Sequence, residues 1–101
     1  MSKVALFIRH KTLPGKRDAV REIWMRHMQP GIARNPAHEA YFYCFDNDDP
    51  DIIRAFQQYA DLESAQRFVR TQGFAAYLKE IGLLLSETPE VSFATPVWVR
   101  R

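Results

Sequence analysis

The chain has 101 residues, of which 47% are hydrophobic and 13% aromatic. This length and composition predict one globular domain, residues 1–101, with a single hydrophobic core, and exclude a disordered chain. The formal net charge is only +2, so neither nucleic acid nor an anionic membrane is favoured as a partner.

The cysteine count and the lack of a membrane span or signal peptide in the sequence indicate the cellular compartment. Its single cysteine, Cys44, rules out an internal disulfide and fits a reducing compartment. Within a strand, we expect Cys44 to be a small buried hydrophobe. No apolar run approaches the ~20 residues of a membrane span, and no signal-peptide core follows Met1. We therefore expect a cytoplasmic protein without a membrane partner.

The chain opens with a pattern typical of a strand followed by a helix. Residues 4–11 alternate between two sides, as strand residues do. Pro14-Gly15 forms a turn, and a helix is predicted from Lys16 to about Gln29, where Pro30 interrupts it and a loop follows. One face of this helix carries Val20, Ile23, Trp24, His27 and Met28.

The next strand, from about Glu39 to Asp46, is apolar on both of its faces. Alternation places Tyr41, Tyr43 and Phe45 on one side of the sheet. The opposite side receives Ala40, Phe42 and Cys44. A chain of this length can cover one sheet face with its own helices, which leaves the other face uncovered. We therefore expect a second copy of the chain to cover it.

The acidic stretch 46–50 lies between this strand and the next. Its carboxylates could suit calcium, but the ligand spacing and the glycine of a calcium loop are missing, so we predict a hairpin turn. Residues 52–59 form the third strand, with Gln57 and Tyr59 on one face.

Two helices and a strand complete the chain. Asp61 is predicted to cap a short helix that bears Phe68, and a second helix is predicted from Phe74 to Leu85. The last strand is predicted from Val91 to Val99, at an edge or bent, because Pro96 cannot donate to a ladder. The order β-α-β-β-α-α-β predicts an α+β, ferredoxin-like fold with an antiparallel sheet.

With these elements placed, the chain resembles the antibiotic biosynthesis monooxygenase family over nearly its whole length. The matching passages are Pro14-Gly15-Lys16 before the first helix, Phe56 to Ala65, Thr71-Gln72-Gly73-Phe74 and Pro89-Glu90-Val91. The resemblance implies a homodimeric α/β barrel with a pocket between sheet and helices in each subunit. It also implies oxygenation of small aromatic or quinol-type substrates without a flavin, nicotinamide or metal cofactor.

The chain departs from the family pattern at three positions. Gln57 stands where the family often has a glutamate, and Phe68 and Gly73 stand where many members have histidines. The haem-degrading branch needs a tryptophan and a histidine at positions that are here Phe68 and Leu78, so we exclude haem degradation. No cofactor motif is present, and zinc is not expected because His10, His27, His38 and Cys44 lie on different elements.

Cofactor-free oxygen chemistry needs a base and an apolar pocket. His27 is the expected base, because its ordinary pKa lies near neutrality and it shares the apolar helix face. In the alternative interpretation, His27 is a hydrogen-bonded histidine of the core without a catalytic role. Trp24 could likewise be a core residue that does not contact a substrate. In the catalytic interpretation Trp24 and Phe68 line the pocket, and Gln57, Tyr59 and Tyr77 contact the substrate.

The sequence leaves three functions open. The first is a cofactor-independent monooxygenase acting on a small aromatic or quinol-type substrate. The second is a non-catalytic, small-molecule-binding or stress-related barrel, which the missing histidines favour. The third is a cofactor-free isomerase or decarboxylase that uses the same pocket, because one fold hosts many functions.

Overall fold

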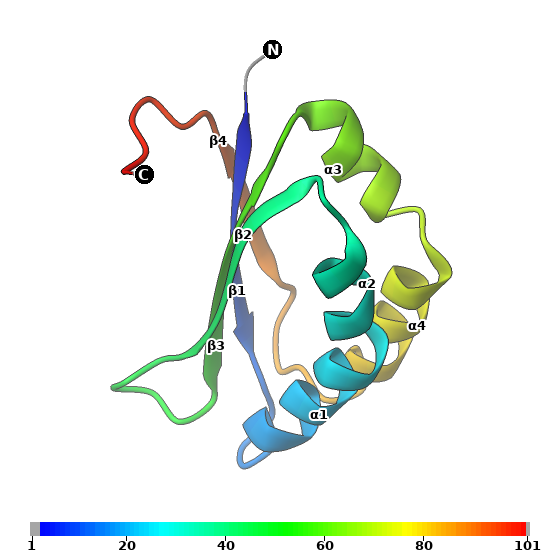
Figure 1. Cartoon of the computed structure of the whole chain (residues 1–101). Coiled ribbons are helices and arrows are strands. Elements are labelled where there is room, and N and C mark those ends of the chain that lie inside the picture. The colour runs from blue at the N-terminus through cyan, green and yellow to red at the C-terminus, as the bar shows by residue number, and fades with distance from the viewer. Residues whose placement is uncertain (1–2, 101) are drawn as a thin grey trace.

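Four antiparallel strands form one sheet, and helices cover one of its two faces (Figure 1). The computed structural model describes residues 3–100. Its strands are β1 (Val4–Lys11), β2 (His38–Phe45), β3 (Ile52–Tyr59) and β4 (Glu90–Ala94). Its helices are α1 (Arg17–His27), α2 (Gln29–Arg34), α3 (Leu62–Phe68) and α4 (Gln72–Ile81). The sheet order β2-β3-β1-β4 confirms the predicted ferredoxin-like class.

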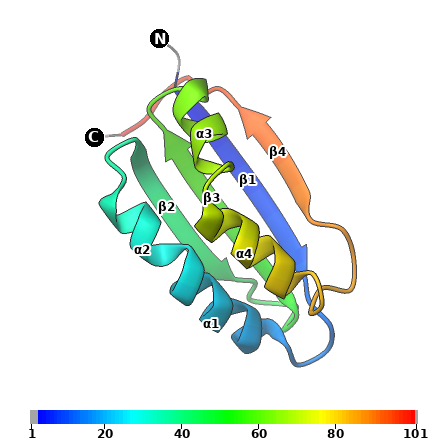
Figure 2. The same cartoon turned by 90° about the vertical axis from the view of Figure 1, so that its right-hand side faces the viewer.

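The first helical region differs from the prediction after His27. The chain does not enter a loop at Pro30 but begins α2, with Pro30 in its first turn. A proline is tolerated there because the first N–H groups of a helix have no partner within it. In Figure 2, α1 and α2 follow one another along the β2 side of the sheet.

Side-chain caps set the starts of the next two helices. Asp61 accepts a hydrogen bond from the backbone N–H of Ser64 at 2.7 Å, which confirms the predicted cap. Thr71 caps α4, so this helix begins at Gln72, earlier than predicted. It ends at Ile81 rather than Leu85, because the following residues bond to the end of β1 instead. None of the helices between residues 3 and 100 is long and apolar enough to cross a membrane.

The last strand is shorter than predicted. It ends at Ala94, which pairs with Ala5, and not at Val99. Pro96 lacks the N–H that would continue the ladder. Beyond β4 the chain lies on the side of the sheet away from the helices, where residues 95–100 border Ala5 and Phe7 (Figure 1).

The acidic stretch between β2 and β3 forms the predicted turn. Asp46 Oδ2 accepts hydrogen bonds from the backbone N–H groups of Asp48 and Asp49, and its Oδ1 accepts one from Arg54. The Arg54 bond and the two backbone bonds hold the pKa of Asp46 at about 2. Among residues 3–100, no three His, Cys, Asp or Glu side chains gather as metal ligands would.

The two faces of the sheet have different surroundings. On the helix side, the buried core includes Leu6, Val20, Ile53, Tyr59, Tyr77 and Ile81. On the far side, the register aligns Phe42, Phe56 and Phe7 in one row across β2, β3 and β1. Phe42 is 59% exposed and Phe7 49% exposed. Cys44 is also exposed, so the expectation that it is buried is wrong for the single chain.

Candidate functional site

A cavity of about 250 Å³ lies between the sheet and the helices. Most of its wall is apolar, with side chains from β1, β3, β4, α3 and α4 such as Leu6, Ala55, Phe68 and Phe74. Six polar side chains also line it: His10, Tyr41, Tyr43, Gln57, Tyr59 and Tyr77. An apolar hollow with a few convergent polar groups is the usual form of a small-molecule site. We call it the inner cavity.

His10 and Tyr77 form a buried polar pair in this wall. His10 is only 5% exposed, and its Nε2 lies 3.2 Å from the Tyr77 hydroxyl. Burial lowers the pKa of His10 to about 4 and raises the pKa of Tyr77 well above its usual value. His10 is therefore neutral at neutral pH. Its Nδ1 is buried and has no hydrogen-bond partner among the described residues.

A second buried polar atom without a partner in residues 3–100 is the hydroxyl of Tyr43. Burial raises the pKa of Tyr43. Trp24 packs behind these residues: its ring stacks on Tyr43 at 4.3 Å between centroids, and its indole N–H donates to the Tyr41 hydroxyl at 3.2 Å. Trp24 thus supports two residues of the wall from outside the cavity.

Gln57 is held by a chain of hydrogen bonds that begins outside the cavity. Asn35 Nδ2 donates to His38 Nδ1 at 3.0 Å, so the neutral His38 carries its proton on Nε2 and donates it to Gln57 Oε1 at 3.3 Å. Tyr59 donates to the same oxygen at 2.8 Å. Burial lowers the pKa of His38, partly offset by the bond to Gln57. The side-chain hydrogen bonds of Gln57 all involve its Oε1, and its Nε2 makes none among the described residues.

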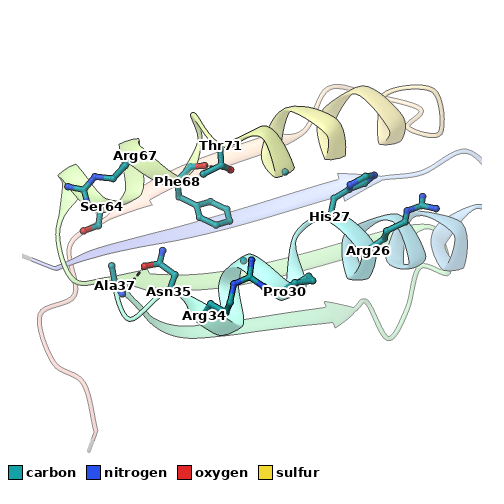
Figure 3. Close-up of a pocket in the computed structure, with 12 residues that line it drawn as sticks. Arg26, His27, Pro30, Arg34, Asn35, Ala37, Ser64, Arg67, Phe68 and Thr71 are labelled. Atoms are coloured by element: carbon teal, nitrogen blue, oxygen red, sulfur yellow. Dashed lines mark hydrogen bonds between the residues drawn. The ribbon is translucent and has the colours of Figure 1, made fainter.

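A second, more open hollow of about 530 Å³ lies between α2 and the α3–α4 segment (Figure 3). We call it the arginine groove, because Arg26, Arg34 and Arg67 line it together with His27, Asn35, Ser64, Phe68, Thr71 and Gly73. Phe68 lines both this groove and the inner cavity. Asn35 lines the groove at the start of the hydrogen-bond chain that reaches Gln57 in the cavity wall.

The structure places the sequence-predicted residues in three environments. Gln57, Tyr59, Phe68 and Tyr77 come together around the inner cavity. His27 lines the arginine groove and hydrogen-bonds Glu80 of α4. Trp24 lies behind Tyr41 and Tyr43. The sequence analysis did not identify His10 or His38 as site residues, although His10 continues the alternation of Leu6 and Ile8 toward the helix side.

Gly73 brings α4 close to the end of α1. A Cβ at this position would lie 2.8 Å from the backbone oxygen of His27, closer than real Cβ contacts. A larger side chain at this position would therefore require the end of α1 and the start of α4 to move apart.

We expect Gly73→Ala to lower the free energy of unfolding by about 1–3 kcal/mol, the usual cost of overpacking. The matched control is Gly31→Ala in α2, where the new Cβ would meet Phe68 at an ordinary 3.8 Å. That variant should be neutral or stabilised by about 0.5–1 kcal/mol, because alanine favours a helix. Urea unfolding of both variants measures the difference, and equal stabilities would contradict the close approach.

Comparison with protein families agrees with the sequence resemblance. Residues 3–80 match the family described as antibiotic biosynthesis monooxygenase. A comparison with curated proteins finds no match.

Solved structures with the same fold span nearly the whole chain. A protein of unknown function from Nitrosomonas europaea is 24% identical, with a TM-score of 0.83 over 100% of this chain and 95% of that one. Rv0793 from Mycobacterium tuberculosis is 19% identical, with a TM-score of 0.86 over 99% and 100%. SnoaB, a cofactor-independent oxygenase from Streptomyces nogalater, is 17% identical, with a TM-score of 0.83 over 98% and 97%. These likenesses establish the fold.

Proposed function

We propose, from the premise that this chain belongs to the antibiotic biosynthesis monooxygenase family, that it is a cofactor-independent monooxygenase. Its substrate is a small aromatic or quinol-type compound bound in the inner cavity. The observation that carries the proposal is an apolar hollow of about 250 Å³ whose wall holds two buried polar atoms, His10 Nδ1 and Tyr43 Oη, that have no partner in the described residues. Such atoms are costly unless a ligand satisfies them.

The volume of the cavity suits one substituted aromatic ring. Engineered cavities of about 150 Å³ hold benzene, so about 250 Å³ accommodates a ring with hydroxyl groups. Phe68 and Phe74 offer aromatic surface for the ring, and the N–H groups of Gln57 and the hydroxyl of Tyr77 can hold its oxygens.

The proposed reaction converts a quinol and O₂ into a hydroxylated quinone and water. A base removes a hydroxyl proton, and the electron-rich ring donates electrons to O₂ and forms a carbon–oxygen bond at an adjacent ring carbon. The base returns its proton to the outer oxygen of the resulting peroxide. That oxygen then leaves as water together with the hydrogen of the ring carbon, and the second hydroxyl proton stays on the hydroxylated quinone. The quinol supplies all the electrons, so the balance requires no external reductant.

We assign the base to His10 in preference to His27. His10 lies in the cavity wall and is neutral at neutral pH, so it can accept a proton. The phenolate formed beside it attracts the imidazolium and makes the transfer more favourable than the isolated pKa of about 4 implies. His27, the base expected from sequence, faces the arginine groove and Glu80. Variants at both histidines distinguish the two assignments.

The experiment is oxygen uptake by the purified, metal-free protein with a panel of substituted hydroquinones under ¹⁸O₂. We expect one labelled oxygen atom in the quinone product, one in water, and no hydrogen peroxide. Peroxide without labelled product would indicate simple quinol oxidation and contradict the monooxygenase. Tight binding of the panel without oxygen uptake would support the alternative, a non-catalytic binding protein.

We also propose that two chains pair through the sheet face that the helices leave uncovered. The row of Phe42, Phe56 and Phe7 gives this face an apolar centre, with ring centroids 5.8 Å and 5.0 Å apart. Ion pairs surround it, including Arg9 with Glu87 and Arg54 with Asp46. An apolar centre with a charged rim is the usual anatomy of a protein interface. Two such sheets packed face to face form the expected α/β barrel.

A further inference from the structure

We propose that the arginine groove binds an anionic group of the substrate, so that the protein acts on quinols that bear a carboxylate on a short side chain. This inference rests on the proposed function. It assigns a role to the arginine groove, which the reaction proposed for the inner cavity does not use.

The side chains that line the groove include basic ones and no acidic ones, although Glu80 and Glu63 beside it pair with Arg26 and Arg67. Arg26, His27, Arg34 and Arg67 line it, and no carboxylate is among its lining residues (Figure 3). The arginines come from the end of α1, the end of α2 and α3, so three separate elements bring an arginine to the edge of one hollow. An arginine without an acidic partner in a concave surface attracts ligands of the opposite sign.

Arg34 is the strongest candidate for an anion contact. Its side chain makes no ion pair or hydrogen bond among the described residues, and it is exposed. Arg67 bonds Glu63 at 2.9 Å and Arg26 bonds Glu80 at 3.0 Å, but both arginines are largely exposed. Exposed pairs of this kind contribute little, so a ligand can replace them at low cost. A guanidinium can hold a carboxylate through two parallel hydrogen bonds.

The groove and the inner cavity share one wall residue, Phe68. This side chain lines both hollows and is 8% exposed. In the proposed binding mode the ring lies against Phe68 in the cavity, and the substituent passes this side chain to reach Arg34. Ser64 adds a hydroxyl group along the groove. The geometry thus favours a ligand with an apolar aromatic end and an anionic end separated by a short chain.

The experiment compares three acids with their methyl esters, which are matched in shape but uncharged. The acids are 2,5-dihydroxybenzoate, 2,5-dihydroxyphenylacetate and 3-(2,5-dihydroxyphenyl)propanoate, measured by calorimetry under nitrogen so that no turnover occurs. We expect at least one acid to bind about tenfold or more tightly than its ester, the effect of one charge-assisted hydrogen bond. Added salt should weaken the binding of the acid and leave the binding of the ester unchanged.

Arg34→Gln should remove most of this preference, because it weakens the binding of the acid and not that of the ester. Arg70→Gln is the matched control, because Arg70 is an exposed arginine two residues beyond Phe68 that does not line the groove. If no acid binds more tightly than its ester, or if Arg34→Gln weakens both equally, the inference is overturned. Oxygen uptake is measured separately. If the protein prefers an acid to its ester but consumes no oxygen, only the monooxygenase proposal is contradicted. If it consumes oxygen without preferring the acid, only the proposed role of the arginine groove is contradicted.

Discussion

The variant His10→Phe is expected to lower kcat for quinol oxygenation by a factor of about 10²–10⁴, the usual contribution of a general base. The ring of His10 lies in the wall of the inner cavity, and its Nδ1 has no partner in the described residues that could compete with a substrate. Phenylalanine keeps a ring of similar volume in this buried place and removes both nitrogens. The measurement is the initial rate of ¹⁸O incorporation at saturating quinol.

Two further variants separate catalysis from packing. Tyr77→Phe removes the hydroxyl that bonds His10 and should cost less activity, because the imidazole that accepts the proton remains. His27→Ala should leave kcat nearly unchanged, since His27 faces the arginine groove. The opposite pattern, with activity lost in His27→Ala and kept in His10→Phe, would return the base to His27. Thermal unfolding of each variant verifies that it is folded.

The assignment of the base to His10 also determines how kcat/KM should depend on pH. His10 must be neutral to accept a proton, and burial lowers its pKa to about 4. The value of kcat/KM, which reports the free enzyme, should therefore fall only as the pH drops through about 4. An acid limb near 6.5, the ordinary pKa of histidine, would exclude His10 as the base.

The second large effect is expected at the uncovered sheet face. Phe42→Asp should convert a dimer into monomers and raise the dissociation constant by about 10²-fold or more, because central aromatic anchors contribute about 2–4 kcal/mol. The new carboxylate would also have to be buried among the phenylalanine rings of two chains. Analytical ultracentrifugation at micromolar concentration measures the change.

The matched control for this variant is Leu62→Asp. Leu62 is 48% exposed on α3, close to the 59% of Phe42, but it lies on the helix side of the molecule. That variant should remain dimeric. A wild-type protein that sediments as a monomer would contradict the proposed barrel, while leaving the inner cavity of the single chain as it is.

Local patterns were sufficient for most of the fold. Alternation identified the strands and placed Gln57 and Tyr59 on one face, where the structure shows them hydrogen-bonded. The Asp61 cap was also predicted, because an N-cap involves residues only three apart. The pattern could not reveal α2, since Pro30 is read as a helix breaker unless the break between α1 and α2 at Met28 is known.

The site was harder to predict because it depends on contacts between distant residues. His10 could have been found from alternation, which places it on the side of Leu6 and Ile8. His38 could not, because an irregularity between His38 and Ala40 shifts the register and places His38 and Tyr41 on the same side. The helical period grouped His27 with Val20 and Ile23, whereas the structure places it in the arginine groove, hydrogen-bonded to Glu80, which is 53 residues away.

The hydrogen-bond chain from Asn35 to Gln57 also bears on which form of the proposed quinol substrate the cavity wall would hold. Both lone pairs of the Gln57 oxygen are engaged, by His38 and Tyr59, so the amide can only give hydrogens to whatever lies against it. A wall of this polarity holds an oxyanion more strongly than a neutral hydroxyl. The amide that stands in place of the family's frequent glutamate would therefore make a bound quinol a stronger acid, where a carboxylate would have made it a weaker one.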